Sequence, residues 1–159
     1  MDDTNIMFMR LAIAQAEAAG ALGEVPVGAI ICRDGVVIAA AHNRRETEQN
    51  ALAHAELLAI ADACRTLESW RLEDCDLYCT LEPCPMCMGA IINARVKRVF
   101  FGASDPKAGC AGSLCDLSQL PFNHKPEMLG GVLQQECGYL LRDFFARLRH
   151  AHKGQAEES

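Results

Sequence analysis

The chain has 159 residues, of which 50% are hydrophobic and 23% are charged, and its formal net charge at pH 7 is −6. This length suits one domain with a sizeable core, and we expect that domain over residues 1–153, followed by a disordered tail over residues 154–159. The negative charge excludes a uniformly basic nucleic-acid coat, although it is compatible with a local basic patch.

The sequence carries no pattern for membrane insertion or secretion. Its longest apolar runs, such as "VPVGAIIC", are much shorter than the about 20 residues that a membrane-spanning helix needs. The first residues, "MDDTNIMFMR", are acidic where a secretory signal would be basic and then apolar. The nine cysteines are an odd number and most stand singly in apolar runs, which is typical of reduced thiols. We therefore expect a cytoplasmic protein.

The first half of the chain opens with a helix and a hairpin. Residues 4–20 have apolar side chains at helical spacing, with Thr4 as a candidate N-cap. Residues 25–43 have the pattern of two strands joined at Asp34-Gly35, a strong hairpin signal.

The remaining segments continue the alternation of strands and helices. After the hairpin the sequence predicts a polar loop at 44–52, a helix from about residue 54 to 67 and a strand at 74–81. A helix follows from Pro83 and Pro85 to about Ala94, and then a strand at 96–103. The last part has a long loop with one short helix at 103–125, a short strand at 125–133 and an amphipathic helix at 134–153. Strands that alternate with helices after an opening hairpin favour an α/β sheet with helices on both faces.

Two short motifs supply a candidate metal site. Cys84 and Cys87 are three positions apart at an expected helix start, so their sulfur atoms can converge where the helix dipole favours thiolates. His54, at the start of another expected helix, would complete a three-ligand zinc set with an open position for water. Zinc lowers the pKa of such a water towards about 7. Glu56 would then be the general acid/base, which carries protons and does not bind the metal.

Other interpretations of the cysteines remain open. A Cys-x-x-Cys pair at a helix start is also typical of thioredoxin-like redox proteins, although that function would leave the histidine and the glutamate without roles. Cys79 could be a fourth ligand, but strand alternation favours a buried thiol. Cys110 and Cys115 could complete a closed four-cysteine zinc site, for which their spacing is irregular.

The motifs "HAE" and "PCPMC" match the His-x-Glu and Pro-Cys-x-x-Cys signature of zinc-dependent nucleobase deaminases. The similarity covers nearly the whole chain, because the segments "GEVPVGAII", "HNRRET", "SWRLEDCDLYCTLEPCPMCMGAI", "RVFFGASDPKAGCAGSL" and "LLRDFFARLR" resemble the bacterial tRNA-specific adenosine deaminase family. The segment "GASDPKAGCAGS" after a strand favours this family over relatives that act on free bases.

The resemblance implies a function, a fold and partners. The reaction would be hydrolytic deamination of adenosine to inosine at the wobble position of tRNA anticodons, by a zinc-activated water with Glu56 as proton shuttle. One zinc ion per subunit would be held by His54, Cys84 and Cys87. The fold would be a three-layer α/β/α cytidine-deaminase-like fold, with a central mixed sheet of about five strands and helices on both faces. The family also implies a homodimer that binds the tRNA anticodon stem-loop.

By the same resemblance, four loop residues would contact the RNA, namely Asn43, Asp105, Lys107 and Asn123. On the C-terminal helix, the basic residues Arg147 and Arg149 suit an RNA backbone, and Phe145 could stack on unpaired bases. Each also has an ordinary structural interpretation. Asn and Asp commonly form turns, charged residues on a helix commonly form a solvated face, and a phenylalanine commonly belongs to the core.

The chain departs from the family pattern at one place. The family usually has Pro-Thr directly before "AHAE", where this chain has Ala51-Leu52. The ligands are unaffected, but the loop that enters the helix can place the substrate differently.

Two other functions compete with the tRNA deaminase. One is a deaminase of free guanine, cytosine or cytidine that shares the metal site but needs no basic helix. The other is a non-catalytic, zinc-stabilised RNA-binding module, in which Glu56 would have no chemical role.

Overall fold

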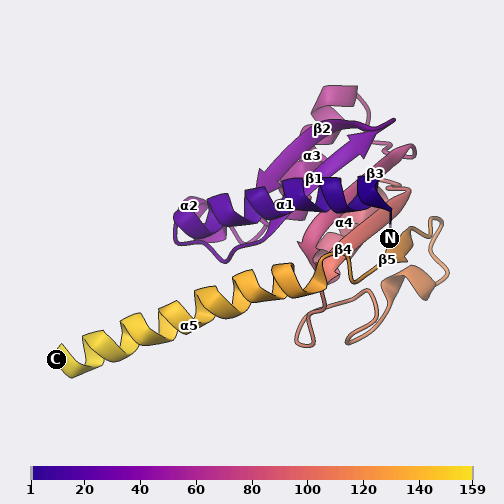
Figure 1. Ribbon diagram of the computed structural model, residues 1–159. Coiled ribbons are helices and arrows are strands. Elements are labelled where there is room, and N and C mark those ends of the chain that lie inside the picture. Colours follow the sequence, from indigo (N-terminus) through magenta and orange to yellow (C-terminus); the bar gives the residue numbers. More distant parts are fainter. Residues whose placement is uncertain (1, 159) are drawn as a thin grey trace.

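The computed structural model describes residues 2–158 and contains a five-stranded sheet with the strand order β2-β1-β3-β4-β5 (Figure 1). The strands are Gly28–Arg33 (β1), Val36–His42 (β2), Cys75–Leu81 (β3), Arg98–Ala103 (β4) and Glu127–Leu129 (β5). The helices are Asp3–Ala21 (α1), Arg45–Glu48 (α2), Ala55–Leu67 (α3), Pro85–Asn93 (α4) and Gln134–Glu158 (α5), with a 3₁₀ turn at Leu117–Gln119 (η1). β1 is antiparallel to β2 and β3, whereas β4 is parallel to β3 and β5, so the sheet is mixed.

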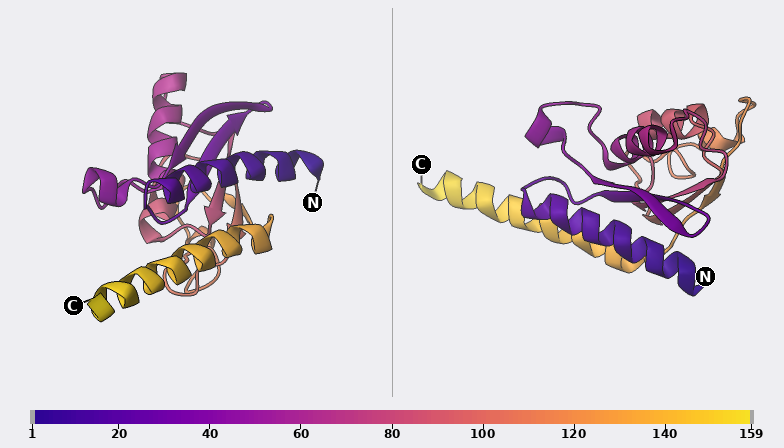
Figure 2. Two further views of the ribbon diagram at one scale, coloured as in Figure 1. Left: turned by 60° about the vertical axis from the view of Figure 1, so that its left-hand side comes forward. Right: turned by 90° about the horizontal axis from the view of Figure 1, so that it is seen from above.

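Helices cover both faces of this sheet and produce three layers (Figure 2). Tyr78 and Phe100 face the layer of α1 and the start of α5. Their neighbours Leu77 and Val99 face the layer of α3 and α4. Successive residues of a strand point to opposite faces, so each strand supplies apolar side chains to two separate cores. The predicted three-layer α/β/α fold is confirmed.

The hairpin between β1 and β2 turns where the sequence predicts it. Asp34 and Gly35 have positive φ angles of 51° and 77°. Two such residues in succession make the turn whose twist matches that of the flanking strands, and Asp-Gly is a favoured pair for it.

The structure differs from the sequence predictions in several places, one of which is the last strand, predicted at 125–133 and found only at Glu127–Leu129. Asp2 caps α1 by accepting a hydrogen bond of 3.0 Å from the Asn5 backbone N–H, so Thr4 is not the cap and lies inside the helix. Part of the predicted polar loop forms the short helix α2. α5 continues to Glu158, through residues predicted as a disordered tail, because Ala, Gln and Glu are good helix formers. Ser159, also part of that predicted tail, lies outside the described residues.

α5 has two parts with different surroundings. Its first turns pack on the sheet, where Cys137 is buried. Its C-terminal part extends well beyond the sheet and the other helices (Figures 1 and 2). Across residues 2–158, no helix is both long enough and apolar enough to cross a membrane.

The end of β3 is the place where the fold can build a site. β3 ends at Leu81, and four residues later α4 begins. α3, on the same face of the sheet, begins directly after His54. Ligands of open α/β sheets commonly bind beyond the carboxyl ends of strands, where such helix starts gather.

The close approach of α1 to β1 depends on Gly28. A Cβ atom there would overlap the backbone oxygen of Ala12 and lie 2.5 Å from the backbone nitrogen of Ala16. Because both are backbone atoms of α1, the helix would have to move. We expect Gly28→Ala to lower the free energy of unfolding by about 1–3 kcal/mol, measured from the midpoint of urea denaturation.

Gly154→Ala is the matched control for this substitution. A Cβ atom at Gly154 would meet no atom within 4 Å, so this variant should be as stable as the unsubstituted protein or slightly more stable. Equal stability of the Gly28→Ala variant would contradict the packing described here.

Candidate active site

Two helix N-termini position the candidate metal ligands. His54 is the N-cap of α3, and Cys84 is the N-cap of α4. Neither side chain makes a capping hydrogen bond, although an N-cap side chain commonly accepts one from the helix backbone. Cys87 follows Cys84 by one helical turn and therefore lies on the same side of α4. The three donor side chains are thus directed towards one another.

The donor atoms have the spacing of a metal site. Nδ1 of His54 lies 3.7 Å from Sγ of Cys84 and 3.5 Å from Sγ of Cys87. All three donor atoms lie within 4.8 Å of one another. A tetrahedral zinc ion with ordinary bond lengths would separate an imidazole nitrogen from a thiolate by about 3.6 Å. The donor set fits a divalent ion such as zinc in type, number and spacing.

The same three groups have strongly shifted acidities. The hydrogen bond from Cys87 and, after it, the one with His54 lower the pKa of Cys84 to about 4, against the effect of burial. The pKa of Cys87 is raised because it donates to Cys84 and is buried. The pKa of His54 is raised mainly by its hydrogen bond with Cys84. The three donor atoms share protons through these hydrogen bonds. A divalent cation can displace those protons, because cysteine binds metal as the thiolate and histidine as the neutral imidazole.

Glu56 lies beside the cluster in the first turn of α3 and is 4% exposed. Its Oε1 is the one buried side-chain polar atom among residues 2–156, the side chains that the structure describes, that has no hydrogen-bond partner. Burial is the main cause of its raised pKa, because a buried carboxylate loses its hydration. A carboxyl group with a raised pKa and an open oxygen is suited to take up and release a proton.

The other cysteines stay outside this cluster. Among the described residues, the three predicted ligands form the only metal-binding arrangement of His, Cys, Asp or Glu. Cys79 is buried in β3, as strand alternation predicts. Cys110 is buried and Cys115 is exposed, and neither joins the sulfur atoms of the cluster. The arrangement therefore supports neither a four-cysteine site nor Cys79 as a ligand.

A cavity of about 480 Å³ opens at the cluster. Its lining includes His54, Glu56 and Cys84, and the walls come from the loop after β2, the loop after β4 and α5. This volume lies in the range of small-molecule sites, and it is large enough for a nucleobase.

Asn43 lines the cavity and is buried. Its side-chain Nδ2 donates to the backbone oxygen of Val25 at 3.2 Å, and its Oδ1 accepts from the backbone N–H of Arg45 at 3.1 Å. The amide thus holds the loop after β2, as the turn interpretation predicts, while it also borders the cavity.

Asp105, Lys107 and Phe145 also line the cavity. Oδ1 of Asp105 accepts hydrogen bonds from the backbone N–H groups of Lys107 at 3.0 Å and Ala108 at 3.2 Å, which is ordinary turn chemistry. Phe145 is 40% exposed and meets the ring of Phe144 edge-on at 5.4 Å, so it is not a core residue.

The other predicted RNA contacts lie outside the cavity lining. Asn123 is exposed on the segment between η1 and β5. Arg147 and Arg149 are exposed on α5, and Arg147 forms an ion pair with Asp143 at 3.1 Å. These side chains could meet only a ligand that extends beyond the cavity.

Arg45 lines the cavity and has no place among the predicted site residues. It follows β2 by three residues, in the segment whose sequence predicts a polar loop. The signal that could have found it is the arginine pair of "HNRRET", directly after a strand that ends at the site.

Comparison with known proteins gives consistent results. Residues 1–149 match the family model of the MafB19-like deaminases. A protein of Bacillus subtilis (strain 168), named tRNA-specific adenosine deaminase, is 53% identical over 148 residues, which are 92% of this chain and 92% of that protein. A protein of Aquifex aeolicus (strain VF5) with the same name is 43% identical over 90% of this chain and 95% of its own.

One solved structure shares most of the fold. It comes from a biochemical and structural study of A-to-I editing by tRNA:A34 deaminases at the wobble position of transfer RNA. It is 43% identical, covers 85% of this chain and 99% of its own, and superposes with a TM-score of 0.81. A structure of guanine deaminase from Bacillus subtilis is 41% identical, covers 71% of each chain and has a lower TM-score of 0.63.

The cluster geometry predicts which residue a metal ion needs. We expect His54→Ala to weaken binding of Co²⁺, a spectroscopic substitute for zinc, by about 100-fold or more, because only two of three protein ligands would remain. The measurement is a titration that follows the visible absorption of the bound ion. Cys110→Ala is the matched control and should bind as the unsubstituted protein does. Unchanged binding in the His54→Ala variant would point to a site built from cysteines alone.

Proposed function

This chain belongs to the MafB19-like deaminase family and, within it, to the tRNA-specific adenosine deaminases, and from this membership we propose that it converts adenosine to inosine at position 34, the wobble position of tRNA anticodons. One observation supports the chemistry above all others. The buried Oε1 of Glu56 has no partner and lies beside three converging metal ligands, at a cavity that admits a base.

We propose that His54, Cys84 and Cys87 hold one zinc ion per chain. Two sulfurs and one imidazole leave a fourth tetrahedral position for a non-protein ligand. When bound, zinc supplies the Lewis acidity that makes water nucleophilic near pH 7. The donor spacing of 3.5 to 3.7 Å and the open oxygen of Glu56 support this assignment.

Glu56 moves the protons of the reaction. As water adds to C6 of adenine, Glu56 takes one of its protons and delivers it to N1 of the ring. Glu56 then assists transfer of the remaining proton to the amino group. The bond from C6 to nitrogen breaks, ammonia leaves, and C6 keeps the oxygen as a carbonyl group. A carboxyl group with a raised pKa can serve in both directions.

The substrate extends from the cavity to the surface. Asn43, Asp105, Lys107 and Phe145, which line the cavity, would contact the target nucleotide and its neighbours. Asn123, Arg147 and Arg149 would contact the RNA farther away. A base in an anticodon loop is unpaired, so less energy is needed to place it in the cavity than to take a base out of a duplex.

The finer assignments follow from the family. We propose a homodimer and a cytoplasmic location, where tRNA is available. Within α4, Met88, Ile91 and Ile92 belong to the core, whereas Met86 is only half-buried and could contribute to a contact between subunits. Residues 1–153 would act as one domain.

The substrate assignment has a direct test. We expect incubation with an anticodon stem-loop that carries adenosine at position 34 to yield inosine, detected by mass analysis of the nucleosides, while free guanine, cytosine and cytidine release no ammonia at a comparable rate. Faster release from a free base or nucleoside would overturn the tRNA assignment and favour the competing deaminase.

Glu56→Gln separates catalysis from binding in the same assay. We expect this variant to keep its metal ion and to lose at least about 100-fold in turnover, since glutamine cannot carry the proton. Undiminished turnover would remove Glu56 from the mechanism and reopen the possibility that the protein is a binding module.

The role of α5 has a separate test. We expect Arg147→Gln combined with Arg149→Gln to weaken stem-loop binding by up to about tenfold and to reduce its salt dependence, because fewer counterions are released. The effect of Arg147 should be the smaller, since Asp143 already pairs with it. The control removes two other exposed arginines, Arg33 and Arg65. Equal affinities would show that this part of α5 is only a solvated surface.

A further inference from the structure

Two buried carboxylates near the cavity have no part in the proposed chemistry. Glu24 is 1% exposed and Glu82 is 3% exposed. Acidic side chains are rarely buried to this degree unless their oxygens are fully engaged. Both carboxylates are engaged by the backbones of loops that line the cavity, so each of them connects the body of the protein to one wall.

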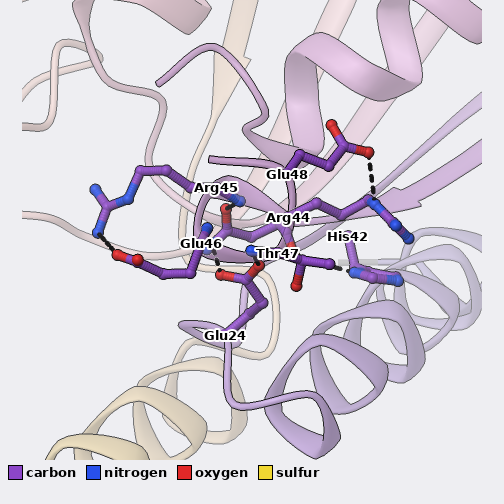
Figure 3. A network of polar contacts seen from close by, with 8 residues as sticks. Glu24, His42, Arg44, Arg45, Glu46, Thr47 and Glu48 are labelled. Carbon is purple, nitrogen blue, oxygen red and sulfur yellow. Dashed lines mark hydrogen bonds and ion pairs between the residues drawn. The ribbon is translucent and has the colours of Figure 1, made fainter. Parts of the chain in front are cut away.

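Glu24 holds the segment 44–49. Its Oε1 accepts from the backbone N–H of Glu46 at 3.1 Å, and its Oε2 accepts from that of Thr47 at 2.7 Å (Figure 3). These N–H groups belong to the first turn of α2, whose own N-cap, Arg44, makes no side-chain capping bond. Glu24 therefore satisfies, from a distant segment, the two N–H groups of this turn that follow the one bound by Asn43.

Glu82 holds the loop 104–113 in the same way. Its Oε1 accepts from the backbone N–H of Asp105 at 3.0 Å and from the hydroxyl of Ser113. Its Oε2 accepts from the backbone N–H groups of Ala111 at 3.0 Å and Ser113 at 3.1 Å. A Cβ atom at Gly109 would overlap this carboxyl group, so the loop backbone closes tightly around it.

Both carboxylates are suited to accept hydrogen bonds in the ionised form. Burial by itself would raise the pKa of Glu24, but the hydrogen bonds that it accepts outweigh burial, and its pKa lies below the ordinary value. Glu82 accepts four hydrogen bonds, from three backbone N–H groups and one hydroxyl, which is the arrangement that suits a carboxylate. The bonds are therefore charge-assisted at neutral pH, which makes them stronger than bonds between neutral groups.

Each anchored loop carries one cation to the cavity. Arg45 lies on the segment held by Glu24, and Lys107 lies on the loop held by Glu82. The guanidinium of Arg45 has an exposed ion-pair partner, Glu46, at 3.7 Å (Figure 3). Such a surface pair contributes little energy, so a phosphate can replace the carboxylate. The cavity is thus bordered by two cationic side chains, and a buried carboxylate fixes the backbone of each of their loops.

We propose that Glu24 and Glu82 are positioning residues for substrate recognition: they hold the two walls so that Arg45 and Lys107 meet phosphates of the RNA strand on either side of the target adenosine. This inference rests on the proposed function, and it adds the means by which the site prefers a nucleotide within a strand to a free nucleoside. A wall that is ordered before binding does not lose its conformational entropy when the RNA arrives.

Glutamine substitutions test the two anchors with little change in shape. In Glu24→Gln, the side-chain NH₂ group must face either the Glu46 or the Thr47 backbone N–H, because each carboxylate oxygen binds one of them. In Glu82→Gln, either orientation also places the NH₂ group against a backbone N–H. Each variant therefore loses a hydrogen bond that fixes the loop, while the substituted side chain keeps its size.

We expect either glutamine variant to raise KM for the anticodon stem-loop about tenfold, while kcat changes less than about threefold and the metal content stays the same. Binding of the product stem-loop, with inosine at the target position, can be measured without turnover. The slope of log Kd against log salt concentration should fall by the amount that corresponds to about one phosphate contact in Glu24→Gln, and by the same amount in Arg45→Gln. The double variant should show no further fall in this slope. Glu82→Gln and Lys107→Gln should behave in the same way. A role in stability alone would leave these slopes unchanged.

Glu48→Gln is the matched control. It removes one negative charge from the same segment as α2, but Glu48 binds the side chain of Arg44 at 2.8 Å and no loop backbone (Figure 3). It should keep the KM and the salt slope of the unsubstituted protein. If Glu24→Gln and Glu82→Gln behave like this control, the inference is wrong.

Two further outcomes are decisive. If a glutamine variant does not fold, Arg45→Gln and Lys107→Gln still test the inference, since both side chains are exposed, and an unchanged salt slope in both would overturn it. If the unsubstituted protein does not deaminate the stem-loop at all, the proposed function fails, whatever the variants do. If the unsubstituted protein deaminates the stem-loop and the glutamine variants match the Glu48→Gln control, the proposed function stands and only the positioning role of Glu24 and Glu82 is wrong.

Discussion

The convergence of two helix N-termini beside the end of β3 is the constraint on which the site depends. β3 lies between β1 and β4, so both of its edges are hydrogen-bonded and its end is held firmly. α4 starts from that end and α3 starts close to it, which brings Nδ1 of His54 to within 3.7 Å of both sulfur atoms. The positive ends of the helix dipoles favour thiolates at this point. A shift of either helix by one residue would direct a ligand elsewhere.

Three buried glutamates around the cavity show how surroundings decide what a carboxyl group does. Glu56 keeps one oxygen without a partner, and burial raises its pKa. Glu24 and Glu82 have hydrogen bonds to both oxygens, and in Glu24 these bonds lower the pKa despite burial. The first suits a group that exchanges protons, and the other two suit permanent anions that hold backbone. The same residue type thus suits proton transfer in one place and holds loop backbones in two.

The charge distribution separates the body of the protein from its binding surface. The chain as a whole carries −6, yet Arg45 and Lys107 border the cavity, and Arg147 and Arg149 follow along α5. A negative body discourages indiscriminate binding to polyanions, while local cations near the site would attract the phosphate backbone of the proposed RNA substrate to one place. Phe145, at the cavity and partly exposed, adds an aromatic face to the cavity lining.

The sequence by itself determined the candidate metal ligands, the nearby carboxylate, the strand pattern and the family, because these depend on residue types at short, regular spacings such as "HAE" and "PCPMC". Only the tertiary structure decided which side chains share the cavity: it brought Arg45 in, left Asn123 outside, and showed that Asn43 and Asp105 also hold their own loops. It also showed that Glu24 caps a helix more than 20 residues away and that α5 continues through the expected tail. Contacts between distant segments depend on how loops and helices pack in three dimensions, and spacing along the chain does not record that packing.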